Sequence, residues 1–237
     1  MCGARSTPAR RVEVIGDATL YLGDCMDIMS RLPRVDAVVT DPPYGVGFAE
    51  WDGARPPDAF FDLIRKKAPT CAVHAVQGEI WGWPRPDWVM AWFMPGSVNR
   101  TRGGNFRHWE PVLVYGAERA RVDSRVFPPI GGERCGHPCP KPDAIVRWLV
   151  GEFAEEGQTV LDPFMGSGTT GVACLSLGRK FVGIEIHEPY FDIACRRIEK
   201  EHRRGDFMRV DRGMTRTSQA ALLPTSAARP RARRRPK

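Results

Sequence analysis

The sequence predicts an α/β protein whose core is a mostly parallel β-sheet. Short apolar segments of strand length alternate along the chain with longer segments that have helical periodicity. Two of the predicted strands end in turn-forming motifs, one rich in proline and one rich in glycine. Apolar residues make up 42% of the 237 residues, which is enough to build a sizeable core.

The predicted strands are apolar segments bounded by glycine, proline or charged residues. They lie at residues 19–22, 37–40, 71–76, 89–94, 112–115, 159–161 and 181–184. Apolar side chains at helical spacing predict helices at residues 144–153, 170–177 and 189–202. Pro142 precedes the first of these helices, where a proline is well tolerated. The alternation is typical of strands joined by crossover helices, as a parallel sheet requires.

Charge and composition divide the chain into three parts. We expect an N-terminal extension at residues 1–18, a folded body at 19–204 and a basic, disordered tail at 205–237. The formal net charge is +7, and residues 229–237 carry six positive and no negative charges, which leaves +1 for the remainder. Such a tail either binds nucleic acid by releasing counterions, without sequence preference, or is a solvated chain end.

Composition disfavours two classes of protein. No segment approaches the roughly 18 consecutive apolar residues of a membrane span, and the N-terminus lacks the apolar centre of a secretory signal. The seven cysteines are odd in number and mostly scattered, which argues against a disulfide framework. We therefore expect a cytoplasmic protein that has no membrane partner.

A glycine-rich loop joins the predicted strand at 159–161 to the helix at 170–177. Gly166 and Gly168 permit positive φ angles and close backbone approach. The helix N-terminus offers unpaired N–H groups to an anion, either a phosphate or a carboxylate. No lysine follows the last glycine, so this is not a Walker loop. Glu185 ends the next strand, where an acid accepts hydrogen bonds from ribose hydroxyls in nucleotide-like sites.

The segment Asp41-Pro42-Pro43-Tyr44 directly follows the predicted strand at 37–40. Its two prolines fix the backbone and remove two N–H donors. Asp41 supplies a carboxylate acceptor beside the carbonyl of Pro42, and Tyr44 supplies an aromatic face. Two acceptors next to a stacking surface suit an exocyclic amino group on a planar base.

These motifs resemble those of the beta-class DNA amino methyltransferases, the adenine-N6 and cytosine-N4 enzymes of the DPPY type. In chain order, the matches are motif III at residues 22–25, IV at 41–44, VIII at 108–115, X at 135–142, I at 161–170 and II at 183–186. This order, with motif IV before motif I, is similar to the circular permutation of that class. The resemblance implies a Rossmann-like S-adenosylmethionine-dependent methyltransferase fold with one antiparallel strand.

The resemblance also implies a cofactor site for S-adenosylmethionine. Its methionine part would be lined by Asp162, Phe164, Gly166, Gly168 and Thr169. Glu185 would hold the ribose hydroxyls, and Asp24 would lie near the adenine of the cofactor. Lys141 and the N-terminus of the helix at Asp143 would meet the cofactor carboxylate.

The implied reaction is direct methyl transfer from the sulfonium to a base nitrogen in double-stranded DNA. Asp41 and the Pro42 carbonyl would accept the amino protons, Pro43 would complete the rigid turn, and Tyr44 would stack on the flipped base. In the family, aspartate at the first motif position usually accompanies adenine N6 and serine cytosine N4, so Asp41 favours adenine. Alternatives that stay open are cytosine N4, an RNA or protein-glutamine substrate, and a non-catalytic nucleic-acid-binding relative.

Target recognition is expected to be small, because the stretch at 116–134 is only 19 residues long. Recognition would be short, or shared with residues 79–107 or with a partner subunit. Arg100, Arg102 and Arg107 surround two glycines, and they form either a loop near the DNA phosphates or an ordinary solvated loop. Similar enzymes occur in restriction–modification systems or as small solitary enzymes of prokaryotic and phage-infected cells, often as homodimers.

Three other sequence features have competing interpretations. Cys135, His137 and Cys139 resemble metal ligands, but zinc typically takes two separated ligand pairs and no second pair is evident, so we predict no metal. The Pro138-Cys139 pair resembles the nucleophile of cytosine-C5 methyltransferases, yet here the DPPY motif takes that place. Four tryptophans lie close together in the sequence, at Trp81, Trp83, Trp88 and Trp92. They either stack on unpaired bases or fill the core.

Overall fold

The computed structural model describes residues 9–45, 47, 52–76, 78, 80–97, 107–116, 122–127 and 141–220, with side chains up to residue 205. The chain divides into two compact units, Met1–His202 and Arg203–Lys237. The sheet, its apolar clusters and the candidate site belong to the first unit.

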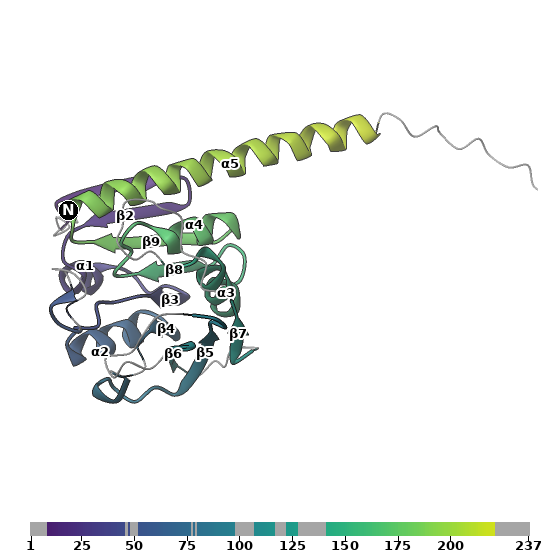
Figure 1. Ribbon diagram of the computed structural model, residues 1–237. Helices are drawn as coiled ribbons and strands as arrows, with labels where there is room; N and C mark the ends of the chain where they lie inside the picture. Colours follow the sequence, from purple (N-terminus) through teal and green to yellow (C-terminus); the bar gives the residue numbers. More distant parts are fainter. Residues whose placement is uncertain are drawn as a thin grey trace, which may run out of the picture. The chain divides into compact units, whose positions relative to one another are not determined.

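One mixed sheet of nine strands runs through the described part of the first unit (Figure 1). The strand order across the sheet is β1-β2-β9-β8-β3-β4-β6-β5-β7. The strands are β1 (Arg11–Ile15), β2 (Ala18–Leu22), β3 (Ala37–Thr40), β4 (Thr70–His74), β5 (Trp88–Phe93), β6 (Trp109–Gly116), β7 (Ser124–Val126), β8 (Thr159–Asp162) and β9 (Lys180–Glu185). The central strands are continuous apolar runs because both of their faces are covered.

The direction of the strands fixes where a site can form. β2, β9, β8, β3 and β4 run parallel, so their carboxyl ends meet at one edge of the sheet. β6 runs antiparallel to both β4 and β5, and β7 runs parallel to β5. Ligands of open α/β sheets bind at the carboxyl edge of the parallel strands.

The structure corrects two expectations at the N-terminal end. β1 pairs antiparallel with β2, from Arg11 opposite Leu22 to Ile15 opposite Ala18, so residues expected as an extension belong to the sheet. β1 and β6 both oppose the main strand direction, where the resemblance implied one antiparallel strand. β1 is an edge strand that alternates charged residues with exposed valines, so it lacks the continuous apolar run of a central strand.

The described residues form five α-helices and a 3₁₀ turn, and all of these except the last helix lie between strands. They are α1 (Cys25–Arg31), α2 (Asp58–Lys67), η2 (Ile80–Gly82), α3 (Asp143–Phe153), α4 (Thr169–Ser176) and α5 (Glu188–Ala220). The prediction lacks α1 and α2. It also ends the last helix near residue 202, whereas α5 continues to Ala220, into the segment expected as a disordered tail. No helix in these parts of the chain is long and apolar enough to cross a membrane.

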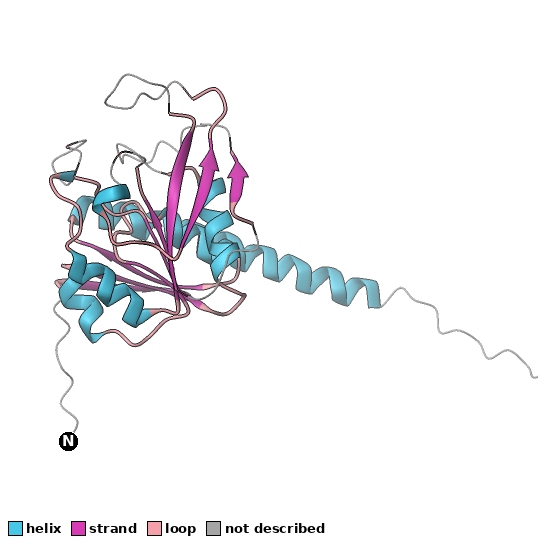
Figure 2. Cartoon of the chain, turned by 90° about the horizontal axis from the view of Figure 1, so that it is seen from below, coloured by secondary structure: helices cyan, strands magenta, loops and turns pink. Residues whose placement is uncertain are grey.

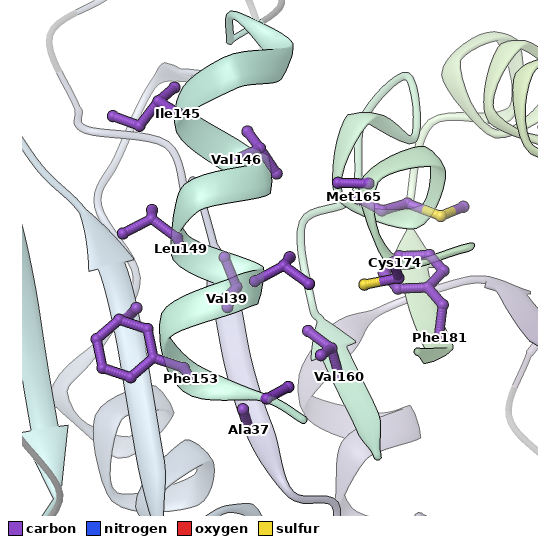
Figure 3. Packing of buried hydrophobic residues seen from close by; sticks show 14 of the residues in the cluster. Ala37, Val39, Ile145, Val146, Leu149, Phe153, Val160, Met165, Cys174 and Phe181 are labelled. Atoms are coloured by element: carbon purple, nitrogen blue, oxygen red, sulfur yellow. The ribbon is translucent and has the colours of Figure 1, made fainter. Parts of the chain in front are cut away.

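Two apolar clusters cover the two faces of the sheet, which has helices on both sides (Figure 2). On one face, Ile145, Leu149 and Phe153 of α3 pack against the sheet (Figure 3). On the other face, α2 buries Phe60 and Ile64. Burial of each such side chain stabilises the fold by about 1.5–3 kcal/mol. The clusters hold the parallel strands in register and so define the carboxyl edge.

Candidate active site

A cavity of about 170 Å³ opens at the carboxyl ends of β3, β4, β8 and β9. The glycine-rich loop and Glu185 line one side, which we call the loop half. Asp41, His74 and Lys141 line the other side, and with Tyr44 and Glu110 we call it the charged half. Further lining residues are Val39, Thr40, Pro43, Val146, Asp162, Phe164, Met165, Ser167, Thr169, Thr170, Ile186, His187 and Tyr190.

Asp162 ends β8 and anchors the glycine-rich loop. Its Oδ1 accepts hydrogen bonds from Thr40 Oγ1 at 2.7 Å and from the backbone N–H of Phe164 at 3.1 Å. Its Oδ2 accepts one from Thr170 Oγ1 at 2.6 Å. Burial raises the pKa of Asp162 to about 6, because the loss of hydration outweighs these neutral donors.

Glu185 ends β9 and faces the loop from the neighbouring strand. Its Oε2 accepts the backbone N–H of Gly166 at 2.9 Å, and its Oε1 accepts that of His187 at 2.7 Å. Burial raises the pKa of Glu185, since both donors are neutral amides. A carboxylate offers about four lone-pair positions, so each oxygen keeps capacity for a hydroxyl group in the cavity.

The structure separates the residues predicted to bind the cofactor into two groups. Asp162, Phe164, Gly166, Thr169, Glu185 and Lys141 line the cavity, whereas Gly168 and Asp24 do not. Gly168 has φ +83° at the start of α4, and a Cβ there would lie 2.9 Å from Ala194 Cβ of α5. Asp24 is the N-cap of α1 and accepts the backbone N–H of Met26 at 2.7 Å. Gly168 therefore allows α4 and α5 to pack closely, and Asp24 caps α1.

Strand alternation brings the charged half together. Val39, Ala72 and Val112 belong to the apolar cluster under α3. Side chains two residues apart on a strand share a face, so Asp41, His74 and Glu110 project on that same side of β3, β4 and β6. The residues at the start of α3, including Lys141, cover this face.

Lys141 is the centre of the charged half. Its Nζ lies 3.3 Å from Asp41 Oδ1 and 3.5 Å from Glu110 Oε2, and it donates to the Tyr44 hydroxyl at 3.0 Å. The Lys141 and Glu110 side chains are 13% and 7% exposed. Burial opposes the charge on Lys141, but the carboxylates and Tyr44 raise its pKa well above the usual value. The resemblance implied a contact with the cofactor carboxylate, and the structure joins Lys141 to the DPPY motif.

Asp41 is a carboxylate acceptor that stays ionised. Burial opposes its charge, but the Lys141 ammonium and a hydrogen bond from the Tyr44 hydroxyl hold the pKa of Asp41 below its usual value. Burial and the Asp41 charge raise the pKa of Tyr44 well above its usual value, so the phenol keeps its proton. The buried side chain of Asp52 fixes the turn by accepting the Tyr44 backbone N–H at 2.6 Å.

Three residues of this region were missed by the sequence analysis, namely Asp52, His74 and Glu110. Glu110 lies within the strand that resembles motif VIII, yet it gave no sign of its ion pairs with Lys141 and Arg107. His74 is the last residue of a buried strand, and a polar side chain at that position is a local signal that could have singled it out.

The predicted DNA-contacting and metal-binding residues are only partly described. Arg107 forms an ion pair with Glu110 at 3.1 Å, while Arg100 and Arg102 lie outside the described residues. Cys135, His137 and Cys139 also lie outside them, and the described part of the chain has no group of three or more potential metal ligands. Trp83 is buried and packs against Phe61 at a ring distance of 5.4 Å, whereas Trp81 is 88% exposed.

Comparison with known proteins identifies relatives along most of the chain. The model of the N6/N4 methyltransferase family, described as DNA methylase, matches residues 78–196. YubD of Escherichia coli K12, described as a methylase, is 30% identical over 200 residues, covering 74% of this chain and 88% of YubD. The DNA adenine methyltransferase YhdJ of the same organism is 26% identical over 225 residues, covering 70% and 76%.

Two solved structures share the fold. The complex of M1.HpyAVI with S-adenosylmethionine aligns with a TM-score of 0.58 at 23% identity, over 76% of this chain and 98% of that chain. The cytosine-N4-specific PvuII DNA methyltransferase aligns with a TM-score of 0.59 at 16% identity, over 81% and 93%. The fold is thus that of Rossmann-like methyltransferases, with the strand before the DPPY motif preceding the strand before the glycine-rich loop. With the matched family model and YubD, this places the chain in the N6/N4 DNA methyltransferase family.

Proposed function

We propose that this protein transfers a methyl group from S-adenosylmethionine to N6 of adenine in double-stranded DNA. The observation that carries the proposal is the ionised Asp41 at the carboxyl end of β3, in the same cavity as Glu185 and the glycine-rich loop. An anionic acceptor for an amino group therefore faces the place where a nucleoside-containing cofactor would bind.

S-adenosylmethionine fits the chemistry of the loop half. Glu185 accepts the backbone N–H groups of Gly166 and His187 on different oxygens, and a carboxylate with about four lone-pair positions keeps capacity for the ribose hydroxyls. Gly166, at φ +52°, lets the backbone approach a ligand without an intervening side chain. Asp162 and Glu185 bond only to neutral donors in the hydrogen bonds described above, so their charges stay available to a cationic ligand. When bound, the cofactor supplies a methyl group on a positively charged sulfonium.

The residues of the charged half would act on the target base. Asp41 accepts a hydrogen bond from the amino group of the base, orients the nitrogen and stabilises the positive charge that develops on it until the methylated nitrogen releases a proton. The Pro42 carbonyl is the second acceptor. Tyr44 offers its ring to the flipped base while its hydroxyl stays bonded to Asp41 and Lys141. Lys141 keeps Asp41 ionised and in place, so that the acceptor is preorganised before DNA binds.

Adenine is proposed over cytosine because the first motif residue is aspartate. The relative YhdJ is a DNA adenine methyltransferase by name, which agrees with this choice. Both bases present the same amino geometry, so the product has to be identified chemically.

The test is mass spectrometry of nucleosides from duplex DNA incubated with the protein and S-adenosylmethionine. We expect N6-methyladenine from the wild type. Asp41→Ala should lose at least about 10³-fold in rate, in line with the removal of a preorganised charge-stabilising group. Its affinity for the cofactor, measured by calorimetry, should stay within a few-fold. Asp58→Ala, which removes an exposed carboxylate of α2, is the matched control and should behave as wild type.

The possible outcomes separate the alternatives. N4-methylcytosine would overturn the choice of base and keep the chemistry. Cofactor binding without any methylated nucleoside would overturn DNA as the substrate. Normal turnover by Asp41→Ala would remove Asp41 from the catalytic role.

A further inference from the structure

His74 is a buried polar residue that the mechanism above leaves unused. It is the last residue of β4, is 2% exposed and lines the cavity. Neither Nδ1 nor Nε2 has a hydrogen-bond partner among the described residues. Buried polar side chains are almost always paired, and an unpaired one calls for a specific explanation. A ligand that enters the cavity would supply the missing partner.

The position of His74 points to the target base rather than to the cofactor. β3 and β4 are parallel, and Thr40 is paired with Val73, so Asp41 and His74 are the next residues along the two strands. Both project on the same face, and the two side chains lie within electrostatic range of each other. The imidazole therefore lies beside the carboxylate proposed to hold the amino group.

The protonation state of His74 defines what it can bind. Burial lowers the pKa of His74 to about 4, so the ring is neutral at physiological pH. A neutral imidazole has one N–H donor and one acceptor nitrogen. It can therefore donate to a nitrogen that carries no proton, and this suits the edge of a nucleobase.

In adenine, the carbon that bears the amino group is flanked by N1 and by the imidazole-ring carbon next to N7. Both N1 and N7 are hydrogen-bond acceptors close to the amino group. When Asp41 holds the amino group, the N–H group of the neighbouring His74 ring is therefore close to one of these two nitrogens. We propose that His74 donates a hydrogen bond to this ring nitrogen and so fixes and selects the flipped base. A donor directed at N1 would also disfavour guanine and thymine, which carry an N–H group at the matching position of their Watson–Crick edge. The inference rests on adenine being the substrate.

The test combines variants of His74 with altered bases. His74→Leu removes the donor, and His74→Gln keeps one. Thr70→Val is the matched control, because Thr70 starts the same strand and also has a buried side chain without a hydrogen-bond partner among the described residues. The substrate is a duplex oligonucleotide that the wild type methylates, with the target adenine replaced by 1-deazaadenine or 7-deazaadenine. The measured quantity is kcat/KM, with cofactor affinity measured in parallel.

We expect the wild type to lose about tenfold or more on one of the two analogues, since an unpaired polar group then remains in the site. His74→Leu should lose a similar factor on normal adenine and nothing further on that analogue. His74→Gln should retain most activity, and Thr70→Val should match the wild type. Sensitivity to the 1-deaza or to the 7-deaza analogue identifies the nitrogen involved.

Three results would overturn the inference. Full activity of His74→Leu on normal adenine would exclude a contact with the base. Independent, multiplying losses from the variant and the analogue would show that the two do not interact. Loss of cofactor affinity in His74→Leu would place the residue in the cofactor site or the fold. The failure of the proposed function is distinct, because the wild type would then form no N6-methyladenine.

Discussion

The loop half and the charged half of the cavity both contain carboxylates that are buried or partly buried, but they stabilise them in opposite ways. Asp162 and Glu185 accept hydrogen bonds from hydroxyl and amide donors, and burial raises the pKa of both. Asp41 lies 3.3 Å from the Lys141 ammonium, and its pKa is lowered. The loop half leaves the negative charge of its carboxylates for a ligand to neutralise. In the charged half, Lys141 neutralises the negative charge of Asp41 within the protein.

This difference fits the two partners of the proposed reaction. A cationic cofactor gains from carboxylates that have only neutral hydrogen-bond donors. A neutral base requires acceptors of fixed position, and an ion-pair network provides them without leaving an uncompensated charge. His74, whose ring nitrogens have no hydrogen-bond partner among the described residues, belongs to the same half, as expected if the target base completes it.

The largest effect is expected for Lys141→Met, which would break the charged half. The variant leaves Asp41 and Glu110 without their shared cation, and removing one partner of a buried pair typically costs about 3–5 kcal/mol. Because the Asp41 side chain is 31% exposed, we expect the low end, about 3 kcal/mol, in the free energy of unfolding measured by denaturant titration. Arg147→Met removes the more exposed ion pair to Asp143 and is the control, with a cost below about 1 kcal/mol. Equal costs in the two variants would contradict the description of a buried network.

Gly168→Ala would test the packing of the loop half. A side chain at φ +83° is strained, and the new Cβ would lie 2.9 Å from Ala194 Cβ and 3.0 Å from Ala194 Cα. Together these effects should lower the free energy of unfolding by about 2–3 kcal/mol. The matched control is Gly151→Ala in α3, where no atom lies within 4 Å and the helix should gain up to about 1 kcal/mol. An unchanged free energy of unfolding in Gly168→Ala would show that α4 and α5 can move apart without cost.

The sequence predicts the parts of this architecture that depend on local pattern. The central strands are apolar runs, and the turn and loop motifs at Asp41 and Gly166 identify both halves of the cavity. α2 also had a readable signal, with Phe60, Phe61 and Ile64 on one face and basic residues in its last turn. The pairing of Lys141 with Glu110 was beyond prediction because it depends on the register of β6 beside β4. The role of His74 was beyond prediction for the same reason, since its neighbour Asp41 follows another strand, β3.

Asp162→Asn would test the raised pKa of the loop half through the pH dependence of the free energy of unfolding. The pKa of Asp162 is raised from 3.8 to about 6, so between pH 4 and 6 the folded protein binds more protons than the unfolded chain. Stability from this residue is therefore lost as the pH rises. The free energy of unfolding of the wild type, relative to Asp162→Asn, should fall by about 2 kcal/mol between pH 4 and 7. A constant difference across this range would contradict the raised pKa.

The smallest effect is expected for His74→Leu, and it is a gain. Leucine removes a buried group that lacks a hydrogen-bond partner among the described residues, so the free energy of unfolding should rise by about 1 kcal/mol near pH 7.5. The pKa of His74 is lowered to about 4 in the folded protein, and the unfolded chain binds more protons between that value and about 6.5. Wild-type stability from this residue is therefore lost as the pH falls through this window, and the gain in the variant should grow. Thermal unfolding at pH 5 and 7.5, with Thr70→Val as control, measures this. If His74→Leu becomes more stable while losing activity, the wild type sacrifices stability for binding at this position. A destabilised variant would instead mean that His74 serves the fold.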